Sequence, residues 1–169
     1  MHNIFKSILA LGALAAVHAT PVSFTDILNP SDVYLSNSGK SVYTFTHDIL
    51  DNGFNSSTDL ISSADIYIGW SDDFDTQSEN VRISLDNLVV AHSLDVDYGT
   101  YHFNVNSASL QADGKLQVSL EVLSGDFYFQ NSRLDVTANR TEAVPEPTSM
   151  AMMLAGLVGM VFVVRRKGD

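Results

Sequence analysis

The sequence contains no cysteine, and this absence excludes several kinds of chemistry at once. Without thiols the chain has no thiol nucleophile, no cysteine-ligated metal site and no disulfide, so its folded part must be stabilised by a hydrophobic core. Basic residues are also scarce, with 9 Lys and Arg against 20 Asp and Glu and a net charge of −11. A field of that sign repels nucleic acid, which excludes DNA and RNA as partners.

Long uncharged apolar runs are missing from the middle of the chain and occur only at its two ends. Near the start, Lys6 precedes an apolar run from Ile8 to Val17, which is too short to span a bilayer. Val17 and Ala19 then place compact residues at the −3 and −1 positions of a cleavage site. These features are typical of a secretory signal peptide, so we predict that residues 1–19 are removed by cleavage after Ala19.

The second apolar run lies near the C-terminus and predicts a transmembrane helix over residues 148–164. This helix is short for a hydrocarbon core of about 30 Å, but polar and basic flanking residues extend it at both interfaces. A basic tail over residues 165–169 follows, in which Arg165, Arg166 and Lys167 are the predicted membrane-stop residues. Cationic clusters stay on the cytoplasmic side of a membrane, so we expect the acidic part of the chain on the opposite side.

A Pro-Glu-Pro triplet at residues 145–147 directly precedes the predicted helix. Two prolines around one residue hold the segment extended, which stops any upstream helix and exposes the peptide to a protease. The order of triplet, apolar helix and basic cluster over residues 144–169 resembles the PEP-CTERM tail of Gram-negative bacteria. The resemblance implies that an exosortase, a membrane transpeptidase of cysteine type, recognises Pro145, Glu146 and Pro147 and removes the tail. A plain C-terminal membrane anchor is the alternative interpretation.

The resemblance also implies where the protein acts. We expect an exported chain that is held in the cytoplasmic membrane as a precursor and then reaches the cell surface or the extracellular matrix of a Gram-negative bacterium. The leading hypothesis is a non-enzymatic surface or matrix protein sorted by exosortase. The alternative is a carbohydrate-binding or polysaccharide-active exoprotein, stabilised by calcium, with an extracellular polysaccharide as its partner.

Residues 20–143 remain as one extracytoplasmic domain. It contains eighteen acidic and five basic residues, which gives a net charge of −13. Apolar and polar residues alternate with period two at short intervals in this part, whereas helical periodicity is weak. The segments that show this pattern are 42–46, 64–70, 81–85, 101–105, 115–122, 127–129 and 134–136. Roughly seven to nine strands suffice for two packed sheets, so we predict an all-β, antiparallel β-sandwich of jelly-roll or immunoglobulin-like type.

The strongest hairpin signal is the dipeptide Asp113-Gly114, which separates residues 109–112 from residues 115–122. Asp-Gly between two alternating runs favours a tight primed turn. We therefore predict a β-hairpin with a strand on each side of this dipeptide.

Two aromatic residues of the 64–70 segment are expected on opposite faces of their strand. Trp70 has the parity of Ile66 and Ile68, which predicts that its indole lies in the core. Tyr67 has the other parity and is the better candidate for an exposed ring on a sugar-binding surface.

The most acidic stretch lies between two predicted strands and contains Asp72, Asp73, Asp75 and Glu79. Such carboxylates repel one another unless they are solvated or bridged by a cation, and Ca²⁺ takes six to eight oxygen ligands from loops of this kind. The spacing is not that of an EF-hand, because Ser78 stands where that loop needs glycine. A solvated loop and a calcium site formed by these four residues are the two interpretations, and no other cofactor is expected.

The remaining candidates for chemistry carry little signal. His47, His92 and His102 match no zinc-binding spacing. Serine, histidine and aspartate are all present, but no Gly-x-Ser-x-Gly context accompanies them. We therefore predict no catalytic residues and a protein that is not an enzyme.

Overall fold

The computed structural model describes residues 17–72 and 75–143 of the 169-residue chain. Within this part, Ala19–Thr141 forms one compact unit. Most of the predicted signal peptide and all of the predicted sorting signal lie outside the described residues.

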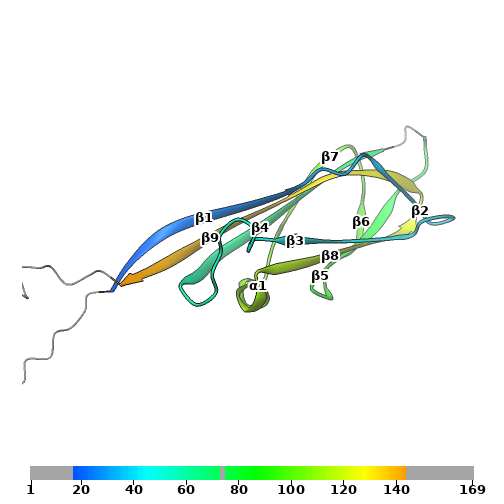
Figure 1. The fold of residues 1–169 in the computed structure, drawn as a ribbon. Coiled ribbons are helices and arrows are strands. Elements are labelled where there is room, and N and C mark those ends of the chain that lie inside the picture. The colour runs from blue at the N-terminus through cyan, green and yellow to red at the C-terminus, as the bar shows by residue number, and fades with distance from the viewer. Residues whose placement is uncertain (1–16, 73–74, 144–169) are drawn as a thin grey trace, which may run out of the picture. The chain divides into compact units, whose positions relative to one another are not determined.

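Two antiparallel sheets make up the unit (Figure 1). The first sheet has the order β1 (Val17–Leu28), β9 (Asp126–Ala143), β4 (Asp59–Asp72) and β7 (Gly99–Asn104), and β2 (Val33–Ser36) also pairs with β9. The second sheet has the order β3 (Val42–Asp48), β8 (Lys115–Ser124), β5 (Asn80–Leu85) and β6 (Leu88–Asp95). The prediction of an all-β fold with two antiparallel sheets is confirmed.

Aromatic side chains from both sheets meet in the interior. Phe45 of β3 stacks on Phe129 of β9, with 5.0 Å between the ring centroids. Trp70 of β4 is fully buried and packs edge-on against Phe127 at 5.2 Å, which confirms the prediction that it belongs to the core. Burial of one such side chain contributes about 3 kcal/mol to the free energy of unfolding.

The predicted hairpin at Asp113-Gly114 is wrong on its N-terminal side. Residues expected as a strand there belong to a helix, α1 (Ser107–Asp113), which buries Leu110. Asn106 caps the start of α1 by accepting a hydrogen bond from the Ala108 amide at 3.0 Å. Gly114 ends the helix in the left-handed conformation, with φ 70°, and its N–H donates to the Leu110 carbonyl at 2.8 Å. A left-handed glycine suits a helix end as well as a primed turn, so the dipeptide alone did not decide between them.

A two-residue hairpin does occur between β5 and β6, at a place that the sequence pattern did not indicate. Asp86 and Asn87 both have positive φ, 47° and 65°, and the flanking residues Leu85 and Leu88 pair with each other. Asp and Asn tolerate this conformation better than other non-glycine residues, which permits the primed turn.

Candidate functional site

Of the residues predicted to direct export and sorting, Ala19 is the one that the structure describes. It is exposed and lies within β1, which runs from Val17 through the predicted cleavage position. Pro145, Glu146 and Pro147 lie outside the described residues, as do the basic residues Arg165, Arg166 and Lys167. Within the described ranges no helix is long and apolar enough to cross a membrane. The predicted span 148–164 lies outside these ranges.

The acidic loop connects the end of β4 to the start of β5, at the opposite end of the first sheet from the last residues of β9 (Figure 1). Asp72 has the same parity along β4 as the buried Trp70, and Glu79 has the same parity as the buried Val81. Both carboxylates therefore sit where inward-facing side chains would continue the core. Asp75 is exposed and receives two hydrogen bonds from Gln77, at 2.6 and 2.7 Å.

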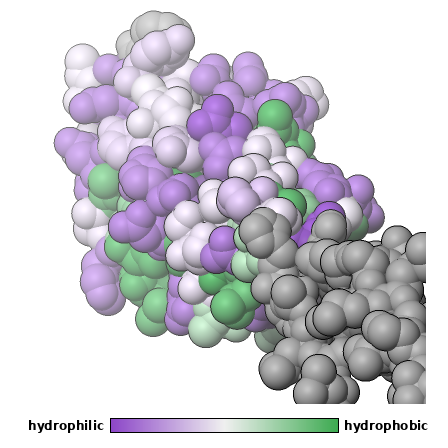
Figure 2. Space-filling model, turned by 90° about the vertical axis from the view of Figure 1, so that its left-hand side faces the viewer, coloured by the Kyte–Doolittle hydropathy of each residue, from purple (hydrophilic) through white to green (hydrophobic). Residues whose placement is uncertain are grey.

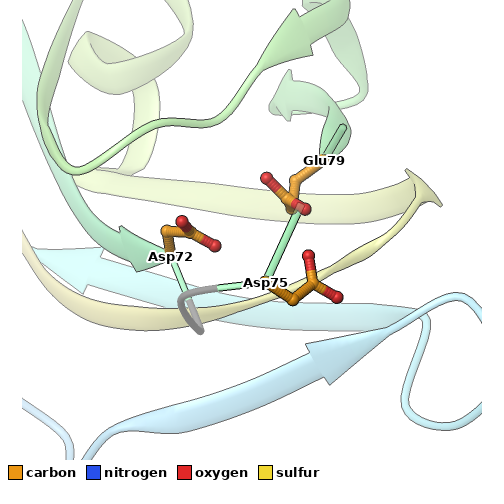
Figure 3. Close-up of side chains that lie close together, drawn as sticks. All are labelled: Asp72, Asp75 and Glu79. Atoms are coloured by element: carbon orange, nitrogen blue, oxygen red, sulfur yellow. The ribbon is translucent and has the colours of Figure 1, made fainter. Parts of the chain in front are cut away.

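The side chains of Asp72, Asp75 and Glu79 lie close together (Figure 3). One carboxylate oxygen from each residue lies within 4.8 Å of those of the other two. Glu79 is only 5% exposed, and Asp72 is half-buried. The Oδ1 atom of Asp72 is buried and has no hydrogen-bond partner among the described residues. Three negative charges thus converge at a partly buried position.

The basic side chains of the domain are placed against other groups. The pairs are Lys40 over the Tyr43 ring, Arg82 with Glu121, Lys115 with Asp48, Arg133 with Asp135 and Arg140 with Asp59. The residues in these pairs all lie outside the acidic cluster.

The structure brings together three of the four residues that the sequence suggested for calcium, namely Asp72, Asp75 and Glu79. Asp73 lies outside the described residues. Asp95, at the end of β6, accepts a hydrogen bond from Ser78 at 3.2 Å and so lies beside the loop. Oxygen ligands from carboxylates suit Ca²⁺, and calcium binding by this cluster stays a prediction.

A second constellation, which the sequence analysis did not identify, joins Asp26, His47 and Ser132. His47 Nδ1 lies 2.8 Å from Asp26 Oδ2, and His47 Nε2 lies 2.8 Å from Ser132 Oγ. A carboxylate only accepts hydrogen bonds, so Nδ1–H donates to Asp26 and Nε2 accepts from the Ser132 hydroxyl. The signal in the sequence was the parity of His47, two residues after the inward-facing Phe45.

The connectivity is that of a Ser-His-Asp triad, but His47 and Ser132 lie in the interior of the domain. His47 and Ser132 are completely buried, so a substrate does not reach the hydroxyl in this structure. Burial lowers the pKa of His47 below its ordinary value, although the hydrogen bond and charge of Asp26 oppose this shift. The three residues come from β1, β3 and β9, so the network links the two sheets through a neutral imidazole.

Tyr67 does not present a free ring, contrary to its expected role on a sugar-binding surface. His102 of β7 stacks on it at 4.9 Å between centroids, and the Arg133 guanidinium of β9 lies over it at 4.6 Å. These neighbours come from strands on opposite sides of β4, so they cover the ring from both sides. His102 also contacts Asp65 at 2.8 Å. His102, Tyr67 and Arg133 thus form a row across three strands, and these cross-strand contacts stabilise the outer face of the first sheet.

The fold and these contacts define the class as an all-β protein built from two packed antiparallel sheets. Residues 143–167 match the family described as the PEP-CTERM protein-sorting motif, so the chain is a protein with a PEP-CTERM sorting motif, as its sequence predicted. The motif indicates an exported protein with a membrane-anchored precursor and an exosortase as its processing partner.

Other comparisons give distant likenesses. Comparison with curated proteins finds no match. A family 35 carbohydrate binding module from Clostridium thermocellum is similar in structure with a TM-score of 0.40 and 12% identity, over 69% of this chain and 98% of that one. Dimeric latent PorU from Porphyromonas gingivalis has a TM-score of 0.37 and 11% identity over 76% of this chain, which matches 14% of PorU.

Proposed function

We propose that this chain is a non-enzymatic surface or matrix protein of a Gram-negative bacterium, sorted by exosortase through its C-terminal signal. The observation that carries the proposal is the match of residues 143–167 to the sorting motif. In this account a signal peptide over residues 1–19 starts export, and the 148–164 helix holds the precursor in the cytoplasmic membrane. Arg165, Arg166 and Lys167 stay in the cytosol, so Pro145, Glu146 and Pro147 are offered on the far side.

The domain itself supports a structural rather than a catalytic role. Its interior is filled by apolar side chains, and the buried Ser132-His47 pair is closed to substrates. The excess of acidic residues keeps a released domain soluble.

Carbohydrate binding is the second candidate, and exposed tyrosines favour it. Tyr98 is 77% exposed, and Tyr34, also exposed, forms a tilted ring pair with Tyr128 at 5.2 Å. Rings of this kind stack on sugar faces. If polysaccharide is the partner, Tyr34→Ala and Tyr98→Ala should each weaken retention of the domain on extracellular polysaccharide, while Tyr67→Ala should not. Equal retention of all variants would leave the matrix role without this ligand.

The sorting function is tested by replacing Pro145, Glu146 and Pro147 with alanine in the full chain. We expect this variant to accumulate uncut in the membrane fraction of an exosortase-containing host. Pro30→Ala, in the loop between β1 and β2, is the matched control and should be processed as the original chain is. Normal processing of the triple variant would refute the proposal.

A further inference from the structure

Strand β9, which leads into the sorting motif, pairs with three other strands of the first sheet. β9 pairs with β1 and β2 on one side and with β4 on the other, and it is the last strand of the domain. It ends at Ala143, the residue at which the match to the sorting motif begins. The enzyme that cuts the tail therefore works close to a strand whose pairing with β4 continues as far as Arg140.

A set of hydrogen bonds from Arg140 to Asp59 and Gly53, here called the Arg140 clamp, fixes this strand close to its end. Arg140 Nε donates to Asp59 Oδ1 at 2.6 Å, and Arg140 Nη2 donates to Asp59 Oδ2 at 2.7 Å. Nη2 also donates to the Gly53 carbonyl at 3.0 Å, and the guanidinium lies 5.8 Å from the centroid of the Phe24 ring. Two parallel charge-assisted hydrogen bonds of this kind are strong and geometrically specific.

The acidic partner of the clamp is itself fixed. The Asp59 side chain is fully buried and also accepts a hydrogen bond from the Asn55 amide at 2.9 Å. The hydrogen bond from Arg140 holds the pKa of Asp59 below its usual range, so the carboxylate stays charged at neutral pH. Opening this end of β9 would leave a buried, unpaired carboxylate, which is costly.

The next residue, Thr141, adds a main-chain hydrogen bond near the start of β4. The Thr141 amide donates to the Thr58 carbonyl at 2.8 Å. From Thr141 to Pro145 the chain has four Cα steps, which reach at most about 14 Å when fully extended. The end of the domain where the clamp lies is turned toward the viewer in Figure 2, and its visible surface shows hydrophilic side chains with apolar patches among them.

We propose that the Arg140 clamp, formed by Arg140, Asp59 and Gly53, limits the rate at which exosortase processes the tail. This inference rests on the proposed sorting function and adds a means by which the folded domain regulates it. A protease binds its substrate as an extended peptide with free backbone groups, which a paired strand does not offer. Between Thr141 and Pro145 lie Glu142 and Ala143, which belong to β9, and Val144, and residues upstream of these become available only when the clamp opens.

The test compares processing rates of full-length chains by pulse-chase in a host that contains exosortase. A flexible spacer of Gly and Ser inserted after Ala143 should speed processing by roughly tenfold or more. Arg140→Ala should speed processing of the original chain to a similar degree. In the chain that carries the spacer, Arg140→Ala should have no further effect, because the clamp no longer matters.

Arg133→Ala is the matched control, since Arg133 lies on the same strand but in the exposed row with Tyr67. It should leave the processing rate unchanged. The spacer leaves the clamp intact, so its result holds even if Arg140→Ala does not fold. Equal or slower processing of the spacer variant would overturn the inference. The alanine triplet at residues 145–147 separates the two claims: if it blocks processing while the spacer has no effect, only the clamp proposal fails.

Discussion

His47 Nε2 lies 2.8 Å from Ser132 Oγ, and this contact ties the second sheet to the first inside the core. Asp26 holds the other ring nitrogen at 2.8 Å, so the neutral imidazole has a partner at both nitrogens. A protonated imidazole would lose its acceptor for the Ser132 hydroxyl and would place a charge between the sheets. The stability of the domain should therefore depend on the protonation state of His47.

The first prediction concerns pH. The pKa of His47 is lowered in the folded domain, so between this value and the ordinary pKa of about 6.5 the unfolded chain binds a proton that the folded chain does not. The contribution of His47 is complete above about pH 6.5 and is lost as pH falls through the folded pKa. Denaturant titrations from pH 7.5 to 5 should show this loss in the original domain. It should be absent in His47→Gln and retained in His92→Gln, where the histidine is exposed.

The second prediction concerns the stability of the Arg140 clamp. Arg140→Ala should lower the free energy of unfolding by about 3 kcal/mol, because it leaves the buried Asp59 carboxylate without its cation. Arg133→Ala removes an ion pair and a ring contact at an exposed position and should cost at most about 1 kcal/mol. Urea denaturation at neutral pH measures the free energy of unfolding of both variants. Equal losses would show that the Arg140 clamp is no stronger than a surface ion pair.

The third prediction tests the calcium hypothesis. If Asp72, Asp75 and Glu79 hold Ca²⁺, millimolar calcium should raise the melting temperature of the domain above its value in EDTA. The double variant Asp72→Asn with Asp75→Asn should lose this rise, while Asp97→Asn, on the exposed segment after β6, should keep it. A melting temperature that calcium does not change would establish the solvated loop instead. In EDTA the double variant should melt higher than the original domain, because it has fewer like charges in contact.

The fourth prediction concerns the end of α1. Gly114→Ala should destabilise the domain by about 2 kcal/mol, because φ is 70° there and an added Cβ would lie 2.8 Å from Leu50 Cδ2. Gly53→Ala is the matched control, since φ is 87° but no atom lies within 4 Å of the added Cβ. It should cost about 1 kcal/mol, from backbone strain alone. Equal losses in thermal or chemical unfolding would show that the contact with Leu50 does not matter.

Parity along a strand was the most reliable information in the sequence. It placed Trp70 in the core and indicated β3, β4 and β5, because inward-facing positions recur every second residue. Strand β6 was not predicted, because its residues are mostly exposed or half-buried and its burial does not alternate clearly along the strand. The helix α1 was mistaken for a strand, because its start depends on one capping contact of Asn106.

Contacts between distant strands set the limit for predicting sites. The residues Asp72, Asp75 and Glu79 are close in sequence, so their convergence followed from the loop alone. Asp26, His47 and Ser132 come from three strands in two sheets, and their meeting depends on the topology. The covering of Tyr67 by His102 and Arg133 depends on strand order in the same way.

The most direct test of the sorting account is the intact mass of the protein after export from an exosortase-containing host. We expect a mature form that begins at Thr20 and has lost the apolar segment 148–164 together with the basic residues that follow it. Recovery of the uncut chain from Met1 to Asp169 in the soluble cytosolic fraction would contradict the account.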